Sequence, residues 1–194
     1  MALDPAGLKT AIEGVFNSSP ASIADFADGL AGAITDYLDA VEIEYPKAPG
    51  VNPSGTPDPS FNPAAFAGST PPASSQRASL KSGIESACAA SDPSRNWAAA
   101  DAAFDAVIVA IGAAWTGDDG YTFSGATVSG GPVGFDAALA TGDSPGPNQP
   151  GGSIPDIAQA IADAVHAATI GSTFTGSYLK AAFVGPGPHT ATLS

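Results

Sequence analysis

A six-residue stretch near the start of the chain, Ser22-Ile23-Ala24-Asp25-Phe26-Ala27, recurs later as Ser153-Ile154-Pro155-Asp156-Ile157-Ala158. In both copies a serine is followed three residues later by an aspartate, an arrangement that approximates a capping box at a helix start. The apolar residues that follow each copy keep the 3.6-residue period of an amphipathic helix. The stretch therefore predicts two long helices, one in each half of the chain.

A second repeated stretch precedes the first of these helices. Leu8-Lys9-Thr10-Ala11-Ile12-Glu13 matches Leu80-Lys81-Ser82-Gly83-Ile84-Glu85. An acid and a proline, Asp4 and Pro5, stand before the first copy, and this pair is typical of the cap and first turn of a helix. The match predicts that two further helices share one design.

A third alignment, displaced by 74 residues, pairs Leu30 with Phe104 and Ile34 with Ile108. One αα-hairpin cannot cover its own apolar stripe, so such units must pack on one another. We therefore predict three αα-hairpin units. In the third unit the first helix is shortened to at most two turns at 134–139.

The segments between and after these units differ in composition. Eight of the 18 prolines lie within 44–75, and neither a helix nor a central strand tolerates that density. The predicted fold is therefore mainly α, with a Pro-rich extended strap and a short β-like or extended C-terminal arm. In order, the predicted parts are a first αα-hairpin at 1–43, the strap at 44–75, a second αα-hairpin with a turn region at 76–131, a third, shortened αα-hairpin at 132–170 and the arm at 171–194.

The turn region of the second unit contains Gly117-Asp118-Asp119-Gly120, which reads as a turn. Two short strands are predicted after it, at 121–123 and 126–128, because aromatic and β-branched residues alternate there with small ones. The two aspartates could contribute to a calcium site, but the spacing of an EF-hand is absent. We interpret them as turn residues.

The charge balance excludes several classes of partner. The 194-residue chain carries 19 acidic and only 6 basic residues, so its net charge is −13. Six scattered cations would release too few counterions for a protein that binds nucleic acid through its phosphates. The excess of negative charge would also repel the chain from an anionic membrane surface. The most apolar window, 106–115, is too short to cross a bilayer, and the first residues do not resemble a signal peptide. We expect a soluble protein made in the cytoplasm.

The sequence predicts no catalytic, cofactor or metal site. Ser177 and Lys180 fit the Ser-x-x-Lys pattern of acyl transfer but lack its partner motifs. The two histidines, His166 and His189, cannot form a three-histidine zinc site, so we expect a solvated or hydrogen-bonded His166. The single Cys88 excludes an internal disulfide.

The combination of Ala-rich αα-hairpin repeats, Pro/Gly-rich straps and a Gly-Pro-Gly-Pro extended C-terminus resembles small virion structural proteins of large contractile-tailed bacteriophages. Those proteins begin each unit with a Leu-x-x-x-Ile/Leu helix, as at Leu8 and Leu80, and continue with a Ser-x-x-hydrophobic-Ala helix, as at Ser22 and Ser153. The resemblance implies a non-enzymatic component of the neck, tail or baseplate, located in the virion and bound to other virion structural proteins.

A core rich in Ala contributes little apolar burial per residue, and small cores are commonly completed by oligomerisation. We therefore expect a homo-oligomer within a particle, with no contact to nucleic acid or membrane. The alternative is a secreted or surface glycan-binding module, for which Trp97 or Trp115 would supply a stacking platform. The candidate interface anchors are Phe61, Phe66, Trp115 and Phe183.

Overall fold

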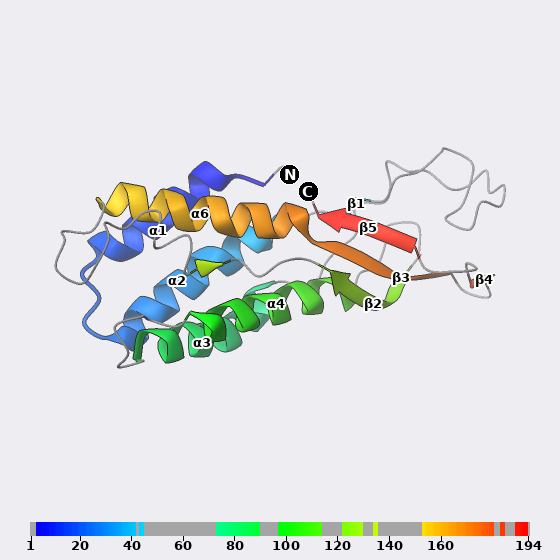
Figure 1. Cartoon of the computed structure of the whole chain (residues 1–194), viewed down its shortest axis with the longest axis horizontal. Coiled ribbons are helices and arrows are strands. Elements are labelled where there is room, and N and C mark those ends of the chain that lie inside the picture. The colour runs from blue at the N-terminus through cyan, green and yellow to red at the C-terminus, as the bar shows by residue number, and fades with distance from the viewer. Residues whose placement is uncertain are drawn as a thin grey trace.

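The computed structural model describes residues 3–41, 43–44, 73–89, 97–113, 122–129, 134–135, 153–180, 183–184 and 189–193. This part of the chain is mainly helical, as the sequence predicts. The helices gather at one end of an elongated molecule and the strands at the other (Figure 1). Two structural regions therefore follow one another along the long axis.

The first two helices are α1 (Pro5–Asn17) and α2 (Ile23–Leu38). Both begin where the sequence predicts. The Asp4 carboxylate accepts a hydrogen bond of 3.1 Å from the Ala6 N–H, and the Ser22 hydroxyl accepts one of 3.1 Å from the Asp25 N–H. These side chains satisfy backbone donors that the first turn of a helix leaves without partners.

The next two helices are α3 (Arg77–Ala89), which follows the 3-10 helix η2 (Ala73–Gln76), and α4 (Ala98–Ala113). A second acid–proline pair of the kind seen at Asp4 and Pro5, Asp92-Pro93, precedes α4 in the sequence and lies outside the described residues. At Gly83 a Cβ atom would lie only 2.6 Å from the Ala103 Cβ and 2.7 Å from the Ala99 carbonyl oxygen. The missing side chain of Gly83 therefore allows α3 and α4 to pack closely.

The last helix, α6 (Ile154–Gly171), also begins at the predicted residue. The Asp156 carboxylate accepts hydrogen bonds from the Ser153 hydroxyl at 2.6 Å and the Ser153 N–H at 3.3 Å. Helix α6 packs on α1, α1 on α2, α2 on α3 and α3 on α4. The chain thus brings its last helix back onto its first.

One apolar core runs through these helices. Its largest fully buried side chains are Ile12, Leu30, Ile34, Leu38, Phe104 and Phe135. Two threonines are buried as well, and each donates its hydroxyl to the carbonyl four residues earlier, Thr35 to Ala31 at 2.8 Å and Thr169 to Val165 at 2.7 Å. No hydroxyl of these threonines is left without a partner in the interior.

The stretches around Leu8 and Leu80 occupy the same place in two helices of equal length. Leu8 and Leu80 are each the fourth residue of a 13-residue helix, and both are buried. The Lys–Glu pairs that follow form ion pairs in both helices, at 3.2 Å in α1 and 3.7 Å in α3. The two matching stretches of sequence therefore both bury their leucine and both form a Lys–Glu ion pair.

The strands form one antiparallel sheet in the order β1-β5-β3-β2, and β4 pairs with the far end of β3. Its strands are β1 (Ile43–Glu44), β2 (Thr122–Ser129), β3 (Thr173–Lys180), β4 (Phe183–Val184) and β5 (His189–Leu193). The predicted C-terminal arm therefore contributes three strands to a shared sheet. In this sheet the arm pairs with β1, which follows the first predicted hairpin, and with β2, which lies in the second predicted unit.

The region of the two predicted short strands contains a single strand, β2. Its pairing with β3 shifts in register between Ser124 and Thr127, around Gly125. Such an irregularity lets one strand continue past a glycine, where the sequence pattern suggested a break.

Most of the predicted strap lies outside the described residues. Of its 32 positions the structure describes only Glu44, in β1, and residues 73–75, in η2. The shortened helix at 134–139 is described only at Gly134 and Phe135, and Phe135 is fully buried.

Candidate functional site

The most distinctive polar contact in the helical region joins α2 to α6. The Tyr37 Oη atom lies 2.6 Å from the His166 Nδ1 atom, and the two rings meet edge to face with centroids 6.3 Å apart. Burial and the nearby Asp4 carboxylate raise the pKa of Tyr37 to about 12. The hydroxyl therefore keeps its proton at neutral pH and can donate it to a neutral imidazole.

The pKa shift of this pair does not suit proton transfer near neutral pH. The raised pKa makes Tyr37 a poorer acid, whereas a phenol that works in acid–base chemistry near neutrality needs a lowered one. Only 7% of Tyr37 is exposed, and its hydroxyl meets the half-buried His166. The geometry fits a tie between two helices, and His166 is the hydrogen-bonded histidine that the sequence predicts.

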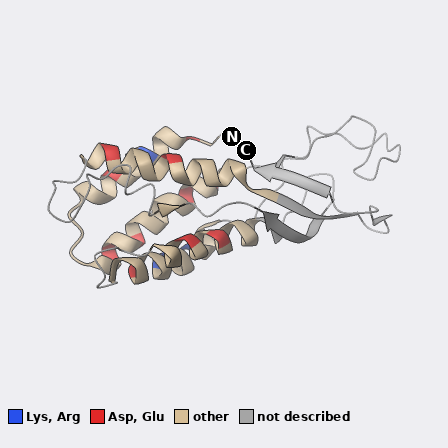
Figure 2. Cartoon of the chain, in the orientation of Figure 1, with Lys and Arg blue, Asp and Glu red and all other residues tan. Residues whose placement is uncertain are grey.

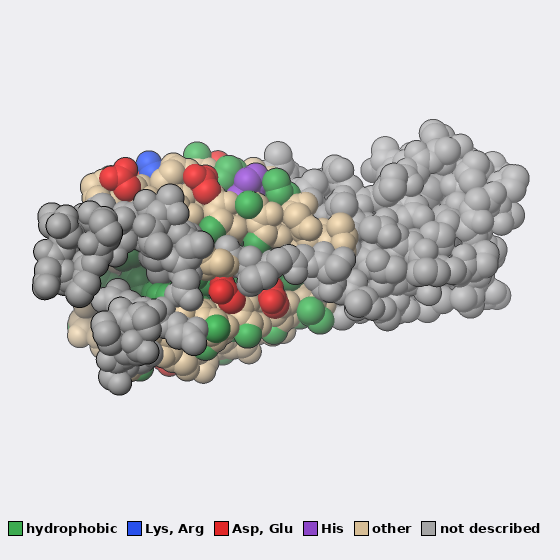
Figure 3. All heavy atoms as spheres, viewed as in Figure 1, with side chains coloured by type: hydrophobic (Ala, Val, Ile, Leu, Met, Phe, Trp, Pro, Cys, Tyr) green, Lys and Arg blue, Asp and Glu red, His purple; other side chains and the backbone are tan. Residues whose placement is uncertain are grey.

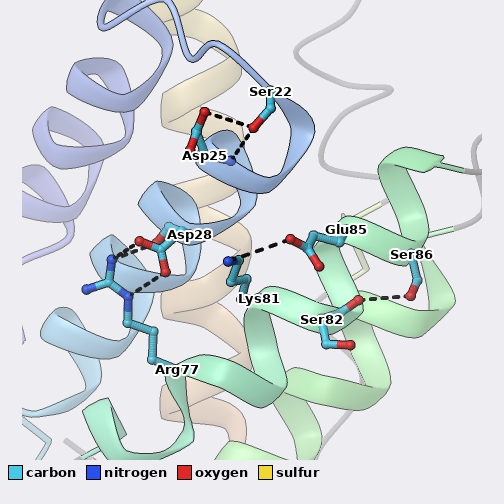
Figure 4. Close-up of polar contacts among 8 residues, drawn as sticks. All are labelled: Ser22, Asp25, Asp28, Arg77, Lys81, Ser82, Glu85 and Ser86. Atoms are coloured by element: carbon cyan, nitrogen blue, oxygen red, sulfur yellow. Dashed lines mark hydrogen bonds and ion pairs between the residues drawn. The ribbon is translucent and has the colours of Figure 1, made fainter.

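A second tie joins α2 to α3 (Figure 4). Arg77 donates to both carboxylate oxygens of Asp28, at 2.6 and 3.2 Å, and also to the Asp28 carbonyl at 3.1 Å. Beneath the guanidinium lies Gly32, where a Cβ atom would be 2.9 Å from the Arg77 Cζ. The planar fork of arginine and a glycine without a side chain together make this bidentate contact possible.

A third tie joins α4 to the segment at Gly134 and Phe135. One carboxylate oxygen of Asp101 accepts hydrogen bonds from the N–H groups of Gly134 at 3.1 Å and Phe135 at 3.2 Å. The Phe135 ring packs on Trp97 with centroids 5.8 Å apart. Gly134 has a positive φ of 72°, which glycine adopts without steric cost.

Acidic residues dominate the surface of the helices, and every basic residue whose side chain is described is ion-paired (Figure 2). Those residues are Lys9, Arg77 and Lys81, which pair with Glu13, Asp28 and Glu85. Burial and the neighbouring Asp101 raise the pKa of Asp105 above its ordinary value. Within the described helices, no Lys or Arg side chain pairs with Asp105.

The candidate interface anchors are not tested by these contacts. Phe61, Phe66 and Trp115 lie outside the described residues, and of Phe183 the structure describes only the backbone, in β4. Trp97, one of the two tryptophans considered for sugar stacking, is 5% exposed and belongs to the core. Ser177 and Lys180 both lie in β3 and not at the start of a helix.

Within the described ranges, no group of three or more His, Cys, Asp or Glu side chains is arranged to hold a metal ion. Among the helices that the structure describes, none is long and apolar enough to span a membrane. Sequence reasoning missed the Tyr37–His166 and Arg77–Asp28 contacts, because each joins residues far apart in the chain.

Comparison with known proteins gives no match to a protein-family model, a curated protein or a solved structure.

Proposed function

We propose that this chain is a non-enzymatic structural subunit of a bacteriophage particle, from the neck, tail or baseplate, that binds neighbouring virion subunits and copies of itself. The proposal includes the division of the chain into three αα-hairpin units joined by a Pro-rich strap. It also includes the location of the protein in the virion and the absence of contacts to nucleic acid and membrane.

The observation that carries the proposal is the use of the polar side chains. In the described helices several of them cap helix starts, as Asp4, Ser22 and Asp156 do, or tie one helix to another, as Tyr37 and Arg77 do. An enzyme concentrates such groups in a cleft, with perturbed pKa values suited to proton transfer. Side chains devoted to holding helices together favour a structural role.

Unit repetition gives further support. With the 131-residue displacement, the buried Ala27, Leu30 and Ala31 of α2 correspond to residues of α6 that are buried as well. Those residues are Ala158, Ile161 and Ala162. Each of α2, α4 and α6 is followed by a strand of the common sheet, namely β1, β2 and β3. Repeated packing units are economical scaffolds for assembly.

The bacteriophage assignment rests on the resemblance of the Ala-rich hairpins and the Gly-Pro-Gly-Pro segment to small virion proteins. Extended Pro-rich segments suit such a role, since they cover large areas on neighbouring subunits and become ordered on assembly.

The test is quantitative mass spectrometry of purified, nuclease-treated particles of the phage that encodes the chain. We expect the chain at a fixed ratio to the tail and neck proteins, through density-gradient purification and a high-salt wash. Its absence from infectious particles, while it is abundant in the infected cell, would overturn the proposal. The mass of the recombinant protein in solution, measured by light scattering, tests the homo-oligomer separately.

A further inference from the structure

We propose that two copies of this chain associate through the outer edge of β2, which is the side of the strand that faces away from β3. The two β2 strands pair antiparallel across a two-fold axis at Gly125 and Ala126, so that the two sheets become one. The inference rests on the proposed function, which includes binding between copies of the chain, and it names the surface that performs this binding.

The first argument is the hydrogen bonding of the sheet. Strand β2 is the last in the order β1-β5-β3-β2, and among the described strands only β3 pairs with it. Successive residues of an antiparallel strand direct their N–H and C=O groups to opposite edges, so about half of the β2 backbone groups face away from β3. Helix α4 contacts β2, but it lies in the helical region, toward which the arrowhead of β2 points (Figure 1). A row of outward donors and acceptors is a template for a further strand.

The second argument is the sequence of this edge strand. Soluble proteins protect the edges of their sheets with charged residues, with proline or with very short strands. Strand β2 is eight residues long, and its sequence, Thr-Phe-Ser-Gly-Ala-Thr-Val-Ser, contains no charged residue and no proline. The strand at the opposite end of the order, β1, has only two residues, of which one is Glu44. Of these two strands, β2 is the one that suits the addition of a partner.

The third argument is the internal symmetry of β2, which favours a second copy of the same strand as the partner. The pairing of β2 with β3 is regular over 122–124 and over 127–129, and its register shifts between these two halves. A two-fold axis at Gly125 and Ala126 therefore places each regular half opposite the other half of the second copy. Glycine within a strand permits the close approach of another backbone. The same surface serves both copies, so the contact closes as a dimer.

The fourth argument is charge. Two copies that each carry a net charge of −13 repel one another, so a contact between them is favoured where acidic residues are few. The space-filling view shows acidic side chains over the helical region (Figure 3). In the five described strands Glu44 is the only acidic residue, and Lys180 is the only Lys or Arg. Pairing of β2 with its own copy brings together no charged residue of either strand.

Amide hydrogen exchange of the ¹⁵N-labelled full chain, measured by NMR in dilute and in concentrated samples, tests this contact. In the dilute sample the inward amides of β2 should exchange slowly, because they bond to β3, and the outward ones should exchange fast. We expect the outward amides to slow by about tenfold or more in the concentrated sample, in which light scattering should show a dimer. The amides of Phe174 and Thr175 are the control and should change much less, since β3 already lies between β2 and β5.

A matched pair of proline variants gives a second test. Thr127 and Val128 are neighbours in one regular half of β2, so one of them directs its N–H to β3 and the other directs it outward. Exchange in the dilute sample identifies which is which. Proline at the outward position should leave the monomer folded by circular dichroism and abolish the dimer. Proline at the inward position removes a hydrogen bond to β3, so it should lower the unfolding temperature of the monomer.

Two results would overturn the β2 contact. One is a dimer that survives proline at the outward position, and the other is outward amides that exchange equally fast in the dilute and concentrated samples. If either result is found while the chain is present in purified particles, only the β2 contact is wrong. If the β2 contact is found and the chain is absent from particles, only the proposed function is wrong.

Discussion

The Tyr37 hydroxyl reaches the His166 imidazole at 2.6 Å across the helical region, although the two residues are 129 positions apart in the chain. Helices α2 and α6 each pack on α1, and this contact also links them directly. Because most of the Tyr37 side chain is buried and its pKa is raised, the contribution of this hydrogen bond to stability should depend on pH.

We expect Tyr37→Phe to lower the free energy of unfolding by about 1–2 kcal/mol at pH 7, because the His166 nitrogen loses its partner. The pKa of Tyr37 is raised to about 12, above its ordinary value of 10.0, so the folded state favours the neutral phenol. The stability that the neutral Tyr37 phenol contributes is fully present below pH 10 and is lost as the pH rises from 10 toward 12. Urea unfolding at pH 7, 9 and 11 measures it.

The difference in stability between the wild type and Tyr37→Phe should therefore be the same at pH 7 and 9 and smaller at pH 11. Ultraviolet titration provides the control, because one of the four tyrosines should titrate late in the wild type and be missing from the variant. A constant difference up to pH 11 would argue against the buried phenol.

Glycine positions in two helices give opposite expectations. At Gly83 an added Cβ meets the Ala103 Cβ at 2.6 Å and the backbone oxygen of Ala99 at 2.7 Å, so Gly83→Ala should separate α3 from α4. We expect a loss of about 1–3 kcal/mol in the free energy of unfolding, as for other overpacked sites.

The matched control for Gly83→Ala is Gly14→Ala in α1, where an added Cβ has nothing within 4 Å. Alanine should stabilise the helix there by up to about 1 kcal/mol. Chemical denaturation of both variants measures the two effects. Stabilisation by both substitutions would contradict the close packing at Gly83.

The Arg77–Asp28 tie depends on the shape of arginine as well as its charge. Its side chains are 41% and 47% exposed, so we expect Arg77→Ala to reduce the free energy of unfolding by no more than about 1 kcal/mol. Arg77→Lys should be nearly as harmful, because an ammonium cannot make the bidentate contact.

A double-mutant cycle with Gly32→Ala checks the geometry of this tie. A Cβ at Gly32 would be 2.9 Å from the Arg77 Cζ, so Gly32→Ala should cost more stability when Arg77 is present than in the Arg77→Ala background. Equal costs in the two backgrounds would mean that the guanidinium does not lie over Gly32.

Ser19, just after α1, has a φ of 54°, in the left-handed region that favours glycine. Ser19→Gly should therefore raise the free energy of unfolding by about 0.5–1 kcal/mol. Ser18 is the control, because its φ is −70° and its hydroxyl donates to the Val15 carbonyl at 2.8 Å. Thermal unfolding should show a gain for Ser19→Gly and a loss for Ser18→Gly.

The sequence predicted the helices well because their signals are local. The caps at Asp4, Ser22 and Ser153 lie within four residues of the groups they satisfy, and the apolar period fixes the buried side of each helix. Confirmed boundaries at Asn17 and Ile154 follow from these signals.

The strand order of the sheet and the polar contacts between helices could not be predicted from these local signals. The pairing of Ile43 with Leu193 and the contact of Tyr37 with His166 depend on how separate elements meet, which no short-range pattern records.

The strand order has a consequence for biosynthesis. Strand β5 lies between β1 and β3, so residues 43–44 have no place in the sheet until residues 189–193 have been translated. During translation the helices can therefore be folded while the edges of β1 and β3 that pair with β5 are still unpaired. Exposed strand edges invite wrong pairing, so the sheet is most prone to mispairing before residues 189–193 have been made.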